Sequence, residues 1–237
     1  MKPDKELRKK YKTYYYDKTD FAPNARLLQS IWRTENDFEF DKYGNFLKLD
    51  FAKETGANFL TNKIFEIVKF EVENKHIDGK VIQEPRIWKN LLSSQPLAFN
   101  LFGELKINKE LATAIFKKLY PDRNIKSVTA IEFEYSPGRK KTKYTGDSSA
   151  FDVFIEYKTE KDKKGFFGIG DFIYLYPTEN LNCKSGIEKY KSTFKESIEN
   201  YFRPLTIEKL VETIKIHCSD KWIIDFENRY LDFDTSR

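Results

Sequence analysis

The chain has 237 residues, of which 33% are charged and 16% aromatic, and its formal net charge is +5. This length supports one sizeable hydrophobic core. No apolar run approaches the ~20 residues that cross a bilayer, and the charged first 20 residues lack the apolar stretch of a secretory signal. Cys183 and Cys218 are too few for a disulfide framework or a zinc motif. We therefore expect a cytoplasmic protein without a membrane partner, and the positive charge permits a polyanionic one.

Two parts of the chain differ in composition. Residues 1–20 form a basic arm whose tyrosines either stack on nucleic-acid bases or pack on the rest of the protein. Residues 21–237 contain no internal repeat and no long linker, so we expect a single domain there.

The first half of the chain predicts mainly helices. Apolar residues recur at helical spacing over residues 25–32 and, most clearly, over residues 57–74. A turn at residues 42–45 predicts a small hairpin. Further helices are expected near Pro85 and after Asn108, which is a suitable N-cap residue.

The stretch from Val128 to Pro177 predicts three strands. Residues 131–135 and 151–157 alternate between apolar and polar side chains. Residues 166–176 are apolar on both faces except for Asp171, a pattern typical of a buried middle strand. Helices are expected again over residues 187–203 and 207–217. This order predicts an α/β or α+β fold with a small mixed β-sheet flanked by helices.

Acidic residues lie on the polar faces of the first two strands. Asp152 is on the second strand, and Glu132 and Glu134 are on the first. Carboxylates on neighbouring strands can converge on a divalent metal ion, because hard cations prefer oxygen ligands. Glu132 and Glu134 fit this role and also fit solvated carboxylates at the edge of a sheet.

Several segments of the chain, taken in order, resemble a known family. They are ANFLTNKI (57–64), LLSSQPLAFNLFGEL (91–105), FEYSPGR (133–139), YTGDSSAFDVFIEY (144–157) and GFFGIG (165–170). Together they are similar to a restriction-endonuclease-like family within the PD-(D/E)XK nuclease superfamily, over residues 25–200. The resemblance implies a restriction-endonuclease-like core and Mg²⁺- or Mn²⁺-dependent hydrolysis of DNA phosphodiester bonds.

The resemblance assigns one half of the superfamily's site clearly. Asp152 takes the place of the first acid, and Asp171 is the nearest candidate for the second acid and metal ligand, with Glu134 as an additional catalytic acid. The acid-x-Lys half departs from the pattern, because Gly170 stands at the acid position and Phe172 at the lysine position. Asp171 is displaced by one residue, which a bulge at Gly168 and Gly170 would restore.

Three explanations of this departure remain open. A lysine of the second hairpin (Lys158, Lys163 or Lys164) replaces the missing one, the site is degenerate, or the segment after Ile169 is a local alteration of a working enzyme. Glu66 and Glu71 could supply the helix acid found in parts of the superfamily, although we expect both to be surface residues.

Two basic clusters flank the strand that carries Asp152. They contain Arg139, Lys140, Lys141 and Lys143 before it, and Lys158, Lys163 and Lys164 after it. Lysine and arginine beside acids would neutralise DNA phosphates, so we expect DNA contacts at these residues. The alternatives are a catalytically inactive DNA-binding protein of the same fold and a non-enzymatic α/β interaction protein. The oligomeric state is open, with a homodimer as one option.

Overall fold

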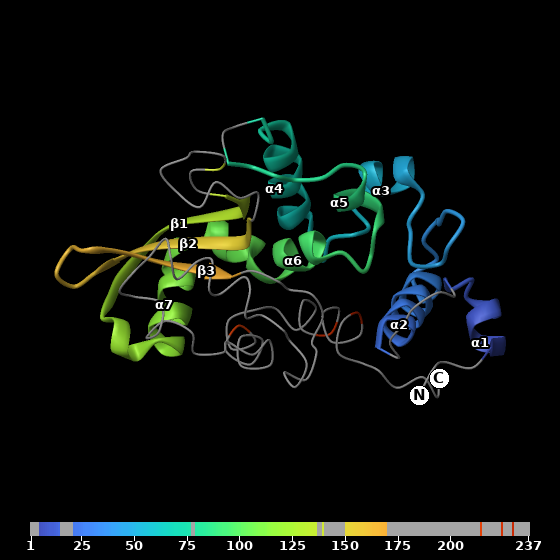
Figure 1. Cartoon of the computed structure of the whole chain (residues 1–237), viewed down its shortest axis with the longest axis horizontal. Coiled ribbons are helices and arrows are strands. Elements are labelled where there is room, and N and C mark those ends of the chain that lie inside the picture. Colours follow the sequence, from blue (N-terminus) through green and yellow to red (C-terminus); the bar gives the residue numbers. More distant parts are fainter. Residues whose placement is uncertain are drawn as a thin grey trace. The chain divides into compact units, whose positions relative to one another are not determined.

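The computed structural model describes residues 5–14, 21–76, 79–136, 139 and 150–169, together with the single residues 214, 224 and 229 (Figure 1). The chain divides into two compact units. The first unit contains residues 1–70, 82–104 and 218–237, and the second contains residues 71–81 and 105–217. The strand expected at 170–176 and, Ile214 apart, the helices expected at 187–203 and 207–217 lie outside the described residues. No helix in the described part is long and apolar enough to cross a membrane.

Among the elements whose bounds the structure describes, the helices precede the strands. The helices are α1 (Lys5–Lys10), α2 (Phe21–Glu35), α3 (Leu49–Thr55), α4 (Asn62–Glu73), α5 (Arg86–Lys89), α6 (Ser94–Ile107), α7 (Lys109–Leu119) and the short 3₁₀ helix η1 (Pro121–Arg123). The strands are β1 (Ile125–Tyr135), β2 (Phe151–Thr159) and β3 (Lys164–Ile169). The fold is α+β with a small sheet, as the sequence predicts.

The first unit is helical and contains the small hairpin. Phe40 pairs with Leu47, and the Asp41 N–H donates to the Phe46 carbonyl at 2.8 Å, which confirms the hairpin around residues 42–45. Helix α3 is not expected from the sequence; it ends at Gly56, whose left-handed φ of 69° suits a residue without a Cβ. The side chain of Leu27 is completely buried in this unit.

Helix α4 begins at Asn62, five residues later than the apolar pattern predicts. The chain before it is bound by distant side chains. The Asn100 side chain accepts from the Leu60 N–H at 3.0 Å, and the Asn58 side chain donates to the Ile87 carbonyl at 2.9 Å. These bonds are incompatible with a helix over residues 57–61, because a backbone N–H that donates to a distant side chain does not donate to a carbonyl of the preceding helical turn.

The second unit is built from α7 packed on one face of the three-stranded sheet. Strands β1, β2 and β3 are adjacent in that order, and both pairings are antiparallel. Helix α7 begins where the sequence predicts, and the Asn108 side chain accepts from the Leu111 N–H at 2.9 Å. Buried side chains of α7 and of the inner sheet face form the core: Ala112, Ile115, Phe116, Leu119, Val128, Ile131, Phe133, Val153, Ile155 and Tyr157. The hydrophobic burial of these residues fixes which face of each strand points outward.

Strand β3 differs from the expectation of a strand buried on both faces. Phe167 is on the inner face and stacks on Tyr157 and Phe116, whereas Phe166 on the other face is 41% exposed. Gly165 is paired with Tyr157, and a Cβ at Gly165 would lie 2.3 Å from the Tyr157 ring. The glycine therefore makes room for a buried ring, and over Lys164–Ile169 only one face of β3 contributes to the core.

Candidate functional site

The structure brings Glu134 and Asp152 opposite each other on neighbouring strands. The pairs Phe133–Val153 and Tyr135–Phe151 flank them, so the same register places Glu134 across from Asp152. Asp152 is half-buried and Glu134 is 8% exposed. The backbone positions of the two acids therefore face each other at the end of the β1–β2 pair that contains Tyr135 and Phe151.

The backbone at Glu134 is in an unusual conformation. Its φ of 47° lies in the left-handed region, which residues with a side chain rarely occupy. Conformations of this kind persist where the surrounding structure enforces them, and they cluster at functional sites. A buried glutamate in such a conformation, opposite a second carboxylate, is the feature that most distinguishes this end of the sheet.

Asp171, the predicted second acid, lies outside the described residues. Strand β3 pairs with β2 without interruption from Lys164 to Ile169, so no bulge occurs at Gly168. Gly168 instead accommodates the ring of Phe151, because a Cβ on this glycine would lie 2.2 Å from the Phe151 Cε1 atom. Gly168 therefore does not supply the bulge that would restore Asp171, and Gly170, the other candidate position, lies outside the described residues.

The oxygen atoms of Glu134 and Asp152 are ligands of the kind that Mg²⁺ and Mn²⁺ prefer. Within the part of the chain that the structure describes, no group of three or more His, Cys, Asp or Glu side chains could hold a metal ion. The described residues thus provide two carboxylates that fit a hard cation, and a further ligand would have to come from elsewhere in the chain.

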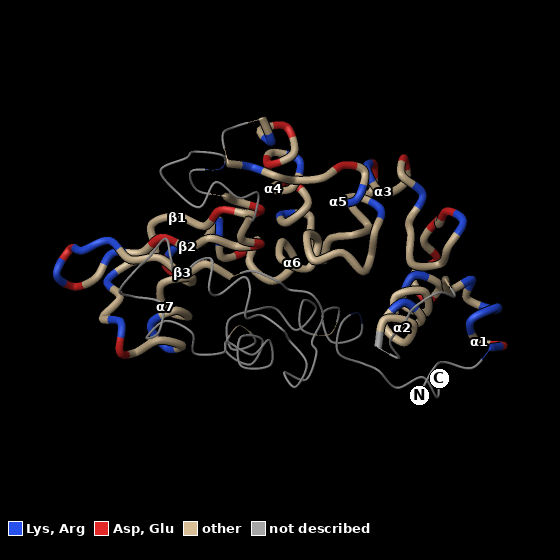
Figure 2. The backbone as a smooth tube through the Cα atoms, viewed as in Figure 1, with Lys and Arg blue, Asp and Glu red and all other residues tan. Residues whose placement is uncertain are grey.

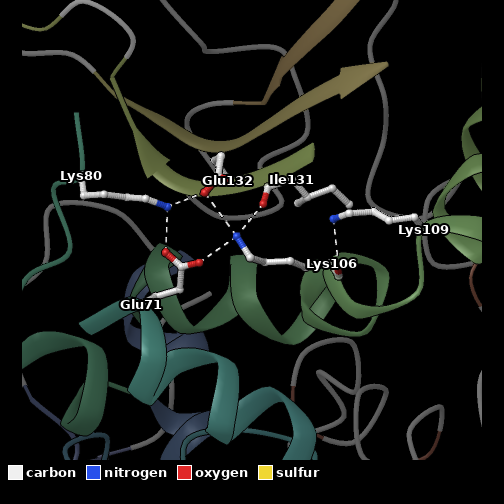
Figure 3. A network of polar contacts seen from close by, with 6 residues as sticks. All are labelled: Glu71, Lys80, Lys106, Lys109, Ile131 and Glu132. Atoms are coloured by element: carbon white, nitrogen blue, oxygen red, sulfur yellow. Dashed lines mark hydrogen bonds and ion pairs between the residues drawn. The ribbon is translucent and has the colours of Figure 1, made fainter. Parts of the chain in front are cut away.

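A closed ring of four charged side chains lies in the same unit (Figure 3). The Lys80 Nζ atom is 2.7 Å from Glu71 and 2.5 Å from Glu132, and the Lys106 Nζ atom is 2.7 Å from Glu71 and 3.2 Å from Glu132. Lys106 also donates to the Ile131 carbonyl at 2.7 Å. Each charge in this ring has two partners of opposite sign, which is the arrangement that makes buried charges tolerable.

Glu71 is not the surface residue that we expect from the sequence. Its side chain is only 3% exposed, whereas Glu66 is exposed and pairs with Lys69 on the surface of α4. The sequence carries a signal for this difference, because Glu71 follows Ile67 by four residues and Val68 by three. It therefore falls on the apolar stripe of α4. Lys80 and Lys106 carry no comparable signal, since their partners come from other elements.

The ring shifts the pKa values of two of its members. Burial by itself would raise the pKa of Glu132, but the hydrogen bonds and charges of Lys80 and Lys106 outweigh it and hold the pKa below its usual value. Burial by itself would lower the pKa of Lys80, but its contacts with Glu132 and Glu71 hold the pKa above the usual value. Both groups are therefore charged near neutral pH. Glu132 is accordingly a partner in the ring and not a solvated carboxylate.

The described residues of the two predicted basic clusters lie toward opposite ends of β2. Arg139 follows the end of β1 that carries Glu134, and its backbone N–H donates to the Ser136 carbonyl at 3.2 Å. Lys158, Lys163 and Lys164 lie at the turn between β2 and β3 (Figure 2). Lys158 lies six positions after Asp152 along β2, a distance of about 20 Å. The lysines of the turn therefore lie too far away to replace the missing lysine at Asp152, and Lys140, Lys141 and Lys143 are outside the described residues.

The turn gathers basic residues that sequence spacing does not reveal. Lys126 at the start of β1 pairs with Asp162 at 2.8 Å, and Lys117 at the end of α7 lies 3.7 Å from Glu160. These residues meet because β1 begins where the β2–β3 turn lies, and the Glu160 N–H donates to the Asn124 carbonyl at 2.9 Å. Only the pairing of the strands could have identified them.

The comparison with known families gives one match. A model described as the PD-(D/E)XK nuclease superfamily matches residues 16–170 and 169–232. The two matched segments meet at residues 169–170, where the superfamily pattern would place its second acid. No curated protein and no solved structure matches the chain.

Proposed function

Because the chain belongs to the PD-(D/E)XK nuclease superfamily, we propose that it is a metal-dependent endonuclease that hydrolyses phosphodiester bonds of DNA. The observation that carries this proposal is the register of β1 and β2, whose pairs Phe133–Val153 and Tyr135–Phe151 place Glu134 across from Asp152. Glu134 is buried and held in a left-handed backbone conformation, as expected of a side chain that must point in one direction.

Asp152 and Glu134 would hold Mg²⁺ or Mn²⁺ through their carboxylate oxygens, and Asp171 would supply a third acid. When bound, the metal would polarise the scissile phosphate and lower the pKa of a bound water. The protein would fix the two carboxylates before substrate arrives, which avoids reorganisation during the reaction. The half-buried position of Asp152 would strengthen its electrostatic interaction with a cation, because few water molecules screen it.

The basic residues would bind the sugar–phosphate backbone of DNA. Arg139, with Lys140, Lys141 and Lys143 of the same loop, would contact phosphates near the acid pair. Lys158, Lys163 and Lys164 would contact phosphates farther along the strand. Because they lie about 20 Å from Asp152, these lysines would contact phosphates several nucleotides away from the scissile bond. Such contacts position DNA without reading its sequence.

A second candidate function is DNA binding without cleavage. It is favoured by Gly170 and Phe172, which stand where the superfamily pattern has an acid and a lysine. A site that lacks both residues would lose one metal ligand and one stabilising positive charge. The two candidates share the same DNA contacts and differ only in the chemistry.

A plasmid-cleavage assay with Mg²⁺ or Mn²⁺ tests the proposal. We expect cleavage by the wild-type chain and its loss in Asp152→Asn, which keeps the shape of the side chain and removes the charge. Asp50→Asn, on the exposed surface of α3, is the matched control and should cleave normally.

The same proteins are also titrated with DNA at low and high salt. Folded wild-type protein that binds DNA with a steep salt dependence but does not cut it would contradict the nuclease and support the second candidate. Absence of both binding and cleavage would contradict both candidates and support an interaction protein.

A further inference from the structure

The segment Gly79–Val81 lies beside β1 at the position of Glu134. Lys80 forms an antiparallel bridge with Tyr135. The Val81 N–H donates to the Glu134 carbonyl at 2.9 Å, and the Ser136 N–H donates to the Gly79 carbonyl at 2.8 Å. The segment thus holds the backbone of β1 on both sides of Tyr135, and one of its two hydrogen bonds acts directly on Glu134.

The side chain of Lys80 holds the same strand at a second point. Its Nζ atom bonds to Glu132, two residues before Glu134, and to Glu71 at the end of α4 (Figure 3). Lys106 closes the ring from the end of α6 by bonding to both glutamates and to the Ile131 carbonyl. Strand β1 is therefore fixed by side-chain contacts before Glu134 and by backbone contacts at and after it.

Gly79 allows this approach of the two backbones. Its φ of 89° is in the left-handed region, and a Cβ would lie 2.9 Å from the ring of Tyr135 and 3.0 Å from the Ser136 carbonyl oxygen. A larger residue would push the segment away from β1. Lys80 can reach the ring of charges only while the segment stays close to β1. Gly79 permits this close approach, and the ion pairs of Lys80 use it.

We propose that Lys80 is a positioning residue for the acid pair and acts through Glu134. The ion pairs of Lys80 hold the Gly79–Val81 segment against β1, and the segment keeps Glu134 in its left-handed conformation opposite Asp152. A strained backbone conformation persists only where its surroundings over-determine it, and here the surroundings include this segment, whose Val81 N–H donates to the Glu134 carbonyl. The proposal rests on the proposed function, because it gives Lys80 a part in holding the metal-binding acids.

Lys80→Met in the full chain tests this role, because methionine keeps an unbranched side chain and removes the charge. Mn²⁺ affinity is measured by calorimetry, kcat and KM are measured on plasmid DNA, and circular dichroism confirms folding. We expect at least a tenfold loss of Mn²⁺ affinity and of kcat with little change in KM, because Lys80 is not among the residues proposed to contact DNA. Lys80→Arg retains the charge and should recover most of both losses.

Lys48→Met is the matched control. Lys48 also forms an ion pair, with Glu39 at 2.8 Å, but both side chains are exposed. We expect wild-type Mn²⁺ affinity and kinetics from this variant. If Lys80→Met does not fold, Glu132→Gln takes its place, since it removes one side of the ring with little change in shape and should also weaken Mn²⁺ binding.

The outcomes separate the two proposals. Mn²⁺ binding that is lost in Asp152→Asn but unchanged in folded Lys80→Met, or in Glu132→Gln where that variant is used, would overturn the positioning role and leave the nuclease proposal standing. Equal losses in Lys80→Met and Lys48→Met would overturn it as well, because a general loss of charge would explain both. Failure of the wild-type chain to bind Mn²⁺ would contradict the acid pair itself, and the positioning role with it.

Discussion

Glu71 and Lys80 form an ion pair of 2.7 Å in which both side chains are almost completely buried, at 3% and 8% exposure. Taking two charges out of water is costly, and only close contact with opposite charges compensates for it. Lys106 and Glu132 provide this compensation by completing the ring. The ring is therefore sensitive to the removal of any single member, because the remaining charges stay buried with too few partners.

Removal of the charge on Glu71 should destabilise the protein strongly. We expect Glu71→Gln to lower the free energy of unfolding by about 3 kcal/mol, the cost of breaking a buried pair. Glu66→Gln on the same helix should change it by less than about 0.5 kcal/mol, since its pair with Lys69 is exposed. Urea denaturation of both variants measures the difference. Equal stabilities would contradict the view that the ring is held by buried charges.

The ring should also make the stability of the protein depend on pH. Stability should fall at low pH because of Glu132 and at high pH because of Lys80. The pKa of Glu132 is lowered in the folded state, so its contribution is present above the usual value of 4.5 and is lost as the pH falls through the lowered pKa. The pKa of Lys80 is raised, so its contribution is present below 10.5 and is lost as the pH rises through the raised pKa.

Comparison of wild type with Glu132→Gln isolates the contribution of Glu132 to the loss of stability at low pH. The difference in the free energy of unfolding between the two proteins should stay constant from about pH 6 to about pH 9 and shrink below pH 4.5. Urea denaturation at each pH provides the values. A difference that grows with acidity would mean that burial, and not the two lysines, dominates the pKa of Glu132.

The cap of α7 gives a prediction for the element that covers the sheet. The Asn108 side chain accepts from the Leu111 N–H, so Asn108→Ala should lower the free energy of unfolding by about 1 kcal/mol. Asn108→Ser should cost much less, because serine is also a good acceptor at this position. Thermal unfolding of the two variants tests the cap. Equal losses from alanine and serine would show that the amide matters for another reason.

The features predicted well from the sequence are those that depend on neighbouring residues. The Asn108 cap and the alternation around Ile155 are local, and the structure confirms both. The predicted start of α4 is wrong because Asn58 and Asn100 are bound by residues distant in sequence. The burial of Glu71 has a local signal in the apolar stripe of α4, but its partners Lys80 and Lys106 escape prediction because they come from two other segments.

The features of the candidate site also fall into those that the local sequence predicts and those that depend on distant residues. The alternating patterns place Glu134 and Asp152 on the polar faces of two neighbouring strands. The register that sets them opposite each other cannot be expected, because the long connection between the strands leaves it open. The left-handed conformation of Glu134 and its contact with Val81 cannot be expected either, because they depend on a segment more than 50 residues earlier in the chain. The separation of Lys158 from Asp152 follows from the length of β2, because basic residues that flank a strand in sequence lie at its two ends.

The two basic clusters should contribute separately to DNA binding. Replacement of Lys158, Lys163 and Lys164 by glutamine should reduce the slope of log affinity against log salt by roughly 0.9 for each phosphate that these lysines neutralise. Arg139→Gln should reduce the slope by the amount expected for one phosphate contact. It should also slow cleavage, because Arg139 follows the end of the sheet that carries Asp152. The triple variant should weaken binding with little effect on kcat, since the turn lies about 20 Å from the acids.

Replacement of the exposed residues Lys42, Lys48 and Lys53 by glutamine removes the same charge from the other unit and serves as the control. Fluorescence anisotropy with a labelled duplex at several salt concentrations gives the slopes. A smaller slope in the turn variant than in the control would assign phosphate contacts to the β2–β3 turn. Identical slopes in the two triple variants would mean that DNA affinity depends only on net charge, and that the lysines of the turn are solvated and do not contact phosphates.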